Sequence, residues 1–300
     1  MKRKIKGYFK NLIKILRKPE MAILPANIAF NLILAIIPIL TIIVLIASTF
    51  DISVDLVTKL VKGMMPEQVS NVIIDVISGK GFDTNIGISN ILAFFLASNG
   101  TLAIINASDA LYKIDNKDKL KKRLSSLVLL LIIIMLLLFL AIVPIFGENI
   151  ISLLHKAKIL EQYIDEITTG FNIIKWPLTL FIIYFNIKLI YTIAPSKNIK
   201  SEETTYGALF TTIMWIISTI VFKFYLSYFA RYDILYGNLS SIIIMLVWFY
   251  FISFIFVLGM AINVSRREEQ EFLEETKKLA LEELTKENKL KKKKKLKENS

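Results

Sequence analysis

The chain has 300 residues, of which 55% are hydrophobic and 21% are charged, and its net charge is +12. A mean hydropathy of +0.58 beside so many charges requires that the charges be segregated, which is typical of a polytopic membrane protein and excludes a water-soluble enzyme. The absence of cysteine and the single histidine, His155, exclude thiolate chemistry and multi-histidine metal centres, so we expect no metal site and no cofactor.

Six apolar stretches are long enough to cross about 30 Å of hydrocarbon as helices, which takes roughly 20 residues. They predict an all-α fold with six transmembrane helices, at 22–50, 86–112, 125–146, 171–193, 207–229 and 237–264. The chain is thereby divided into a basic cytoplasmic N-terminal segment (1–21), a six-helix transmembrane domain (22–264) and a charged cytoplasmic tail (265–300).

Lysine and arginine predict the orientation, because cytoplasmic loops of membrane proteins carry an excess of both. Segment 1–21 contains eight lysine and arginine residues, the 113–124 linker contains six, the 194–206 linker two and the tail twelve. The alternate loops together contain six. We therefore expect a multi-pass protein of the plasma or inner membrane with both termini in the cytoplasm. The same segments are suited to anionic lipid headgroups, and we expect membrane lipids as partners and no nucleic acid.

The two long outer loops predict amphipathic extracytoplasmic helices. Pro66 suits the first position of a helix. Apolar residues then recur at helical spacing, at Val69, Val72, Ile73, Val76 and Ile77. Segment 148–170 has a similar pattern, at Ile159, Leu160, Tyr163, Ile164 and Ile167. Such helices either cover the ends of the spans or form a lid or docking surface.

The tail predicts a charged cytoplasmic helix, because glutamate and lysine alternate at spacings that favour helical ion pairs. We expect the lysine run 291–295 to be disordered and either close to an anionic inner leaflet or simply solvated.

Strongly polar side chains inside the predicted spans are the candidate functional residues, because hydrocarbon offers amides and carboxylates no partner. They are Asn27, Asn31, Asn99, Asn106, Asp109, Asn186 and Asn263. With the predicted orientation, most of them fall in the cytoplasmic half of the spans. Two interpretations stay open: an inward-facing polar cavity, or interhelical hydrogen bonds that only fix the packing.

Two further residues stand out in the spans. Pro38 lies inside the first one, where a proline removes a backbone hydrogen bond, so we predict a hinge or a fixed bend there. Lys113 lies four residues after Asp109 and is predicted to pair with it near the membrane surface.

Several of these stretches resemble the YihY/BrkB family of membrane proteins. The run AFNLILAIIPIL resembles the family's first span, and residues 98–112 resemble its second. The region from GALFTTIMW to the end of the last span is similar to the family's last two spans, at Gly207, Trp215, Tyr225, Tyr236, Gly237, Leu239, Trp248, Tyr250, Gly259 and Asn263. The chain departs from the family at Asp109, where the family usually has asparagine, and at Ala261, where it often has glutamate. A role assigned to that glutamate cannot operate here.

The resemblance covers about residues 10–265 and implies six spans with both ends inside. The family once carried the label ribonuclease BN, but this chain has no metal-ligand cluster and no histidine–carboxylate pair for phosphodiester chemistry, so we do not expect an enzyme. The family's links to envelope integrity and transport imply a transporter or lipid-translocating protein with an inward-facing polar cavity. The alternative is a non-transporting scaffold in envelope assembly, with an envelope protein or a second copy of the chain as partner.

Overall fold

The computed structural model describes residues 13, 16–49, 58, 61–62, 65–78, 87–115, 118–156, 163–228 and 236–298. The elements in chain order are α2 (Glu20–Thr49), α4 (Glu67–Ser78), α5 (Gly87–Leu111), α6 (Lys119–Lys156), α7 (Ile164–Ile193), α8 (Thr205–Tyr228), the 3-10 helix η2 (Gly237–Leu239) and α10 (Ser240–Glu298). Each of these elements is helical, and the described residues contain no strand. The predicted all-helical fold class is therefore confirmed.

Each predicted span coincides with one long helix: α2, α5, α6, α7, α8 or α10. By length and composition, three helical stretches within the described residues can cross a membrane, namely Asp165–Ile193, Thr205–Tyr228 and Ser240–Glu282. A shorter apolar stretch in α2 covers Glu20–Ile36. Membrane crossing by α2, α5 and α6 stays a prediction.

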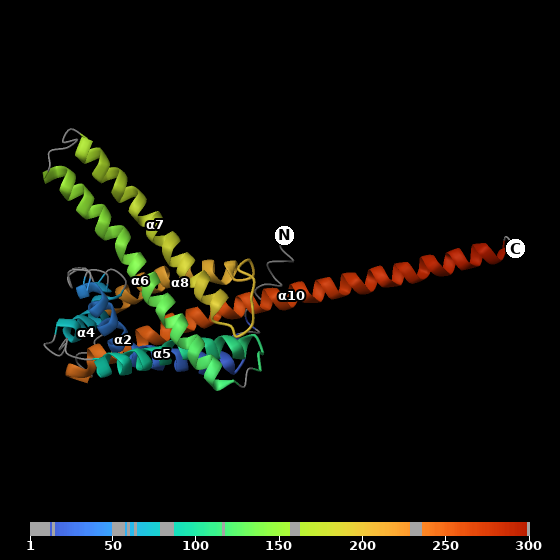
Figure 1. Cartoon of the computed structure of the whole chain (residues 1–300), viewed down its shortest axis with the longest axis horizontal. Helices are drawn as coiled ribbons and strands as arrows, with labels where there is room; N and C mark the ends of the chain where they lie inside the picture. Colours follow the sequence, from blue (N-terminus) through green and yellow to red (C-terminus); the bar gives the residue numbers. More distant parts are fainter. Residues whose placement is uncertain are drawn as a thin grey trace.

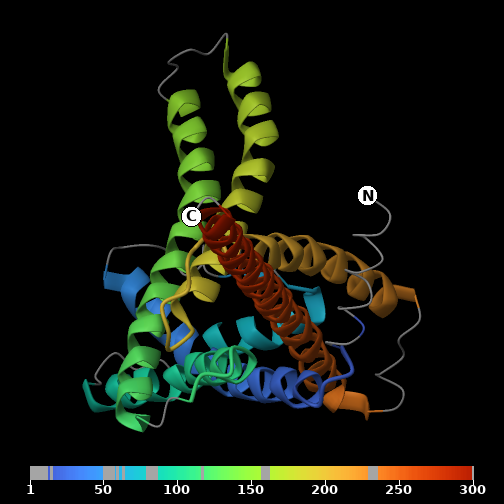
Figure 2. The same cartoon turned by 90° about the vertical axis from the view of Figure 1, so that its right-hand side faces the viewer.

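The helices pack around α2 and α10. Helix α2 packs against α5 and α10, while α10 also contacts α8 and α4. Helix α6 begins against α5 and then lies beside α7, and these two rise together away from the other helices (Figures 1 and 2). The connections 112–118 and 194–204 both lie at the end of the bundle where α10 leaves it (Figure 1). Two basic linkers therefore share one end of the molecule with the base of the tail.

The first predicted outer helix is present as α4, which begins directly after Pro66. The Pro66 carbonyl accepts hydrogen bonds from the backbone N–H groups of Val69 and Ser70, which form the first turn. Val69 and Ile73 are buried, and α4 packs against α10 and α2. The side chains of Val76 and Ile77 lie outside the described part of the chain. Helix α4 thus covers the bundle with the apolar face that its spacing predicts.

The second predicted outer helix is wrong over its described residues. Residues 148–156 continue α6, and residues 164–170 form the first turns of α7, while residues 157–162 lie outside the described part of the chain. No proline interrupts either stretch, and α-helix formation propagates at little cost once it has begun. The apolar patterns of 148–156 and 164–170 therefore lengthen α6 and α7, which lie beside each other (Figure 2).

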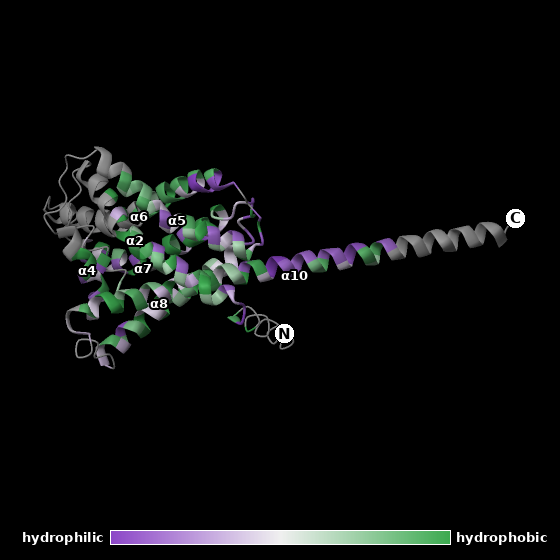
Figure 3. Ribbon diagram, turned by 90° about the horizontal axis from the view of Figure 1, so that it is seen from below, coloured by the Kyte–Doolittle hydropathy of each residue, from purple (hydrophilic) through white to green (hydrophobic). Residues whose placement is uncertain are grey.

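Helix α10 continues from the last predicted span into the charged tail without a break. Its 59 residues correspond to about 90 Å at the helical rise, and its charged part extends far beyond the other helices (Figure 1). The change from apolar to polar residues occurs where α10 leaves the bundle (Figure 3). The predicted disorder of 291–295 is wrong, because the backbone there is helical. Residues 260–298 contain neither glycine nor proline, and leucine, lysine and glutamate favour helix.

Candidate functional site

The contact between α2 and α5 positions four of the candidate amides. A Cβ atom added to Gly100 would lie 3.2 Å from both Ala35 Cβ and Leu32 Cδ2, so glycine permits the two helices to approach closely. Ile28, in the first half of α2, belongs to the same hydrophobic cluster as Ala107, near the end of α5. The two helices therefore run antiparallel.

Asn31 directly precedes the contact residue Leu32 on α2, and Asn99 directly precedes the contact residue Gly100 on α5. Successive helical residues are turned by about 100°, and in an antiparallel pair the position before the contact falls on the same flank of both helices. Asn27 lies one turn before Asn31, and Asn106 lies two turns after Asn99. These four residues, Asn27, Asn31, Asn99 and Asn106, form what we call the amide flank of the α2/α5 pair.

The amide flank is open at two of its members, because the side chains of Asn27 and Asn106 are exposed. Asn31 Nδ2 donates to the Asn27 backbone carbonyl at 2.9 Å and to Asn27 Oδ1 at 3.1 Å. Exposed apolar side chains, including Phe30 and Leu34, lie next to these amides on α2. The flank thus presents amides within an otherwise apolar surface.

Asn99 is the member of the flank that holds a charged group. Its Oδ1 accepts a hydrogen bond of 2.8 Å from Arg123 Nη1, while Arg123 Nη2 donates to the Phe95 carbonyl at 2.7 Å. The guanidinium carbon of Arg123 lies 3.6 Å from the centre of the Phe95 ring. Arg123 is on the first turns of α6, and no spacing in the sequence links it to Asn99 on α5.

Asp109 follows Asn106 by three residues on α5 and, unlike Asn106, is buried, with 3% of its surface exposed. Its Oδ2 lies 2.8 Å from Lys122 Nζ and accepts from Ser196 Oγ at 2.7 Å, and its Oδ1 accepts from the Ser196 backbone N–H at 2.8 Å. This one carboxylate joins α5, the start of α6 and the 194–204 connection. Sequence reasoning missed both partners, because Ser196 is 87 residues away and Lys122 is one of several lysines in its linker.

The predicted Asp109–Lys113 pair is wrong. Helix α5 ends before Lys113, which has a positive φ of 56°. The Ile114 N–H donates to the Asp109 carbonyl at 2.8 Å and the Lys113 N–H to the Ala110 carbonyl at 3.3 Å, which is a Schellman end. This turn carries Lys113 off the helical face of Asp109, and its Nζ lies 2.7 Å from Glu268 Oε1 on α10.

Asn263 lies at the closest contact between α8 and α10. Its Oδ1 accepts from the Gly207 backbone N–H at 2.7 Å, while its buried Nδ2 has no partner among the described residues. A Cβ atom on Gly207 would collide with the Gly259 carbonyl, and one on Gly259 would collide with Thr211 Oγ1. Asn263 therefore takes part in a contact that only glycines permit, as expected for a residue that fixes packing.

A buried tyrosine extends this contact to α7. Tyr191 donates to the Phe256 carbonyl at 2.7 Å, so its oxygen accepts the 2.7 Å hydrogen bond that joins it to Thr211 Oγ1. The remaining candidates lie elsewhere: Asn186 is on α7 with a buried Oδ1 that has no partner in the described region, and Pro38 is inside α2. Whether Pro38 acts as a hinge stays a prediction.

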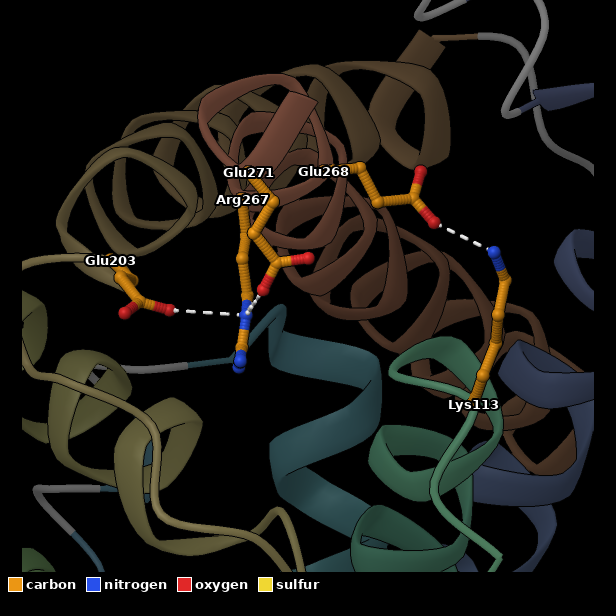
Figure 4. Close-up of polar contacts among 5 residues, drawn as sticks. All are labelled: Lys113, Glu203, Arg267, Glu268 and Glu271. Carbon is orange, nitrogen blue, oxygen red and sulfur yellow. Dashed lines mark hydrogen bonds and ion pairs between the residues drawn. The ribbon is translucent and has the colours of Figure 1, made fainter. Parts of the chain in front are cut away.

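Ion pairs tie the base of the tail to the connecting segments (Figure 4). Arg267 Nε lies 2.9 Å from Glu271 Oε1 and 3.7 Å from Glu203 Oε2, which precedes α8. The hydrogen bond and charge of Glu268 raise the pKa of Lys113. The Lys113–Glu268 pair is exposed, and such pairs contribute little stability each, whereas the side chains of Arg267 and Glu203 are half-buried.

The comparisons with known proteins agree with the resemblance. The model of the virulence factor BrkB family matches residues 14–282. The ribonuclease-like protein YfkH of Bacillus subtilis (strain 168) is 27% identical over 248 residues, which cover 79% of this chain and 87% of that protein. The UPF0761 membrane protein VP0125 of Vibrio parahaemolyticus serotype O3:K6 (strain RIMD 2210633) is 25% identical over 281 residues, 90% of this chain and 85% of its own length.

A third relative, the UPF0761 membrane protein NTHI0384 of Haemophilus influenzae (strain 86-028NP), is 24% identical over 228 residues, covering 74% of this chain and 80% of that protein. No solved structure matches the chain. The family match spans α2 to the first part of the tail, and so includes both the amide flank and the glycine contact of α8 and α10. The chain therefore belongs to the virulence factor BrkB family of membrane proteins.

Proposed function

We propose that the chain is a lipid-translocating protein of the cell membrane, in which the amide flank offers a polar path to a lipid headgroup. The proposal is supported above all by the exposure of Asn27 and Asn106 on two packed helices of a membrane protein. An amide that faces hydrocarbon lacks hydrogen-bond partners, so a polar group of a substrate or water stabilises it.

The surroundings of the flank favour an amphiphile over a small polar solute. Phe30 and Leu34 are exposed beside Asn27, and Phe95 and Leu96 are exposed on α5. A lipid can place its headgroup on the amides while its acyl chains contact these apolar side chains. In this proposal the amide flank takes the place of the predicted inward-facing cavity, which stays a prediction. Asn27 and Asn31 lie in the half of α2 that is predicted to be cytoplasmic. The proposed activity involves no catalysed change of a covalent bond.

Replacement of the exposed amides tests this function. The double variant Asn27→Leu, Asn106→Leu is expected to slow lipid transfer between leaflets by at least about tenfold, because leucine cannot bond a headgroup. The measurement is the loss of fluorescence of headgroup-labelled phospholipid in proteoliposomes after addition of an impermeant reductant. The matched control is Asn172→Leu, which removes an exposed amide of α7. Equal transfer by the double variant and the wild-type chain would refute the proposed path.

A scaffold in envelope assembly is the second candidate, and the length of α10 beyond the bundle favours it. Truncation after Glu282 tests it, because the ion-pairing residues Arg267, Glu268 and Glu271 remain in place. A scaffold that acts through the tail predicts loss of function in cells without loss of folded protein. Lipid translocation through the flank predicts an unchanged transfer rate in proteoliposomes after the same truncation.

A further inference from the structure

Arg123 is a charged side chain held in place at the junction of α5 and α6. Its guanidinium is fixed by Asn99 Oδ1 at 2.8 Å, by the Phe95 carbonyl at 2.7 Å and by the face of the Phe95 ring. Such restraints reduce the rotamer freedom that a long side chain loses on binding. The arginine is therefore preorganised for a ligand.

The guanidinium retains donors that the described residues do not use. Each terminal nitrogen of arginine carries two N–H groups, and Nη1 and Nη2 each make one of the hydrogen bonds above. Its buried Nε has no partner either within the described chain. Both partners of Arg123 are neutral, so its positive charge is not balanced by them. Because Nε is buried, the second N–H groups of Nη1 and Nη2 are the donors left for an anion with two oxygens.

Exposed apolar side chains lie near Arg123 on both helices. On α5, Leu92, Phe95 and Leu96 are exposed, and on α6, Leu120, Leu124 and Leu131 are exposed. Leu120 and Leu124 lie within one turn of Arg123 on α6. A phosphate in free solution gains nothing from these side chains, whereas the glycerol and acyl chains of a lipid can cover them.

We propose that Arg123 binds the phosphate of an anionic phospholipid, whose acyl chains lie along the exposed leucines of α5 and α6. Arg123 lies two residues before the predicted span 125–146, at the end of a linker that is predicted to be cytoplasmic. Lys119, one turn earlier on α6 and exposed, adds a second positive charge. This inference rests on the proposed function, because it assigns an anionic lipid as the class of substrate that enters the amide flank at Asn99.

Equilibrium binding to the full-length chain in neutral detergent tests the site. The probes are phosphatidylglycerol and phosphatidylcholine with identical acyl chains, and native mass spectrometry counts the bound lipids. The wild-type chain is expected to retain phosphatidylglycerol at least about tenfold better than phosphatidylcholine. Of the two headgroups, only that of phosphatidylglycerol carries a net negative charge. Equal retention of the two lipids by the wild-type chain overturns the proposal without any variant.

Three variants then locate the site. Arg123→Gln is expected to lower phosphatidylglycerol retention to the level of phosphatidylcholine, and Arg123→Lys to give an intermediate value, because lysine keeps the charge but cannot bond in a fork. The matched control is Lys121→Gln, which removes the same charge from the same turn on nearly the opposite side of α6. An unchanged preference in Arg123→Gln, or an equal loss in Lys121→Gln, overturns the site.

Helix content by circular dichroism and a single elution peak establish that each variant is folded. If Arg123→Gln does not fold, Arg123→Lys carries the test, and retention equal to wild type overturns the forked contact. Displacement of the lipid by an equal concentration of inorganic phosphate would identify a free-anion site and also overturns the proposal.

The two proposals fail in different experiments. Specific binding that depends on Arg123, together with unchanged leaflet transfer in the Asn27→Leu, Asn106→Leu variant, leaves the lipid site intact and refutes translocation along the flank. Transfer that depends on Asn27 and Asn106 without any preference for phosphatidylglycerol refutes the Arg123 site alone.

Discussion

At the scale of single residues, two glycines decide how α8 and α10 meet. A Cβ atom on Gly207 would lie 2.5 Å from both side-chain polar atoms of Asn263, in addition to its collision with the Gly259 carbonyl. Neither the carbonyl nor the buried amide can move without a shift of a helix. Gly170 on α7 differs, since nothing lies within 4 Å of a Cβ atom there. The same substitution therefore has opposite consequences at these two positions.

Gly207→Ala is expected to destabilise the folded protein by about 1–3 kcal/mol, the usual cost of adding a methyl group to a well-packed contact. Gly170→Ala is the control and is expected to stabilise it by about 0.5–1 kcal/mol, because alanine favours helix over glycine. The midpoint of thermal unfolding in detergent measures both. A midpoint for Gly207→Ala at or above the wild-type value would contradict the close contact.

At the scale of elements, α4 shows that an apolar face on a short outer helix is used for packing. Val69 and Ile73 are buried against the bundle, and Ser70 is also buried, with its hydroxyl donating to the Glu67 carbonyl at 3.0 Å. A helix that opened as a lid would expose these side chains to solvent or lipid. The burial of two successive turns therefore favours the interpretation that α4 covers the ends of the spans.

Ile73→Ala is expected to lower stability by about 2–4 kcal/mol, because it leaves a cavity beneath α4. Asn71→Ala, which changes an exposed side chain of the same helix, is the control and is expected to leave stability nearly unchanged. Thermal unfolding of the purified chain in detergent distinguishes the two. If Ile73→Ala unfolds at the wild-type midpoint, α4 contributes nothing to the folded bundle and acts as a detachable segment.

At the scale of the whole molecule, contacts between distant segments place the basic linkers together. Lys113 of the linker after α5 and Glu203 of the linker before α8 both pair with the base of the tail, at Glu268 and Arg267 (Figure 4). Segments that are far apart in sequence thus lie on one side of the bundle. The lysine and arginine distribution predicts the same grouping, and that this side of the bundle faces the cytoplasm stays a prediction.

The absence of cysteine allows the orientation to be tested with single introduced thiols. Lys197→Cys and Thr169→Cys change exposed residues at opposite ends of α7. An impermeant maleimide is expected to label Thr169→Cys in intact cells and Lys197→Cys only after permeabilisation. The reverse pattern would place the tail and the basic linkers outside the cell.

The helical periodicity and the apolar runs by themselves determined the number and positions of the long helices, since both are local properties of the chain. They also predicted which amides share a helical face. Asn27 lies on the same face as Asn31, and Asn106 on the same face as Asn99, because helical spacing fixes these positions. The sequence pattern failed at 148–156, because α6 continues past Pro144 and Gly147, and at 164–170, which begins α7. It also failed at 291–295, where neither glycine nor proline ends α10 and the helix propagates.

Only the tertiary structure decided the partners of the charges. Asp109 pairs with Lys122 instead of Lys113, and Arg123 bonds to Asn99, because the direction in which α6 crosses α5 brings these side chains together. Ser196 bonds to Asp109 from the connection that follows α7. A crossing of two helices depends on the packing of all their shared neighbours, and no local pattern encodes it. The chain's composition thus determines that it forms apolar helices, while its helix crossings determine which polar side chains meet.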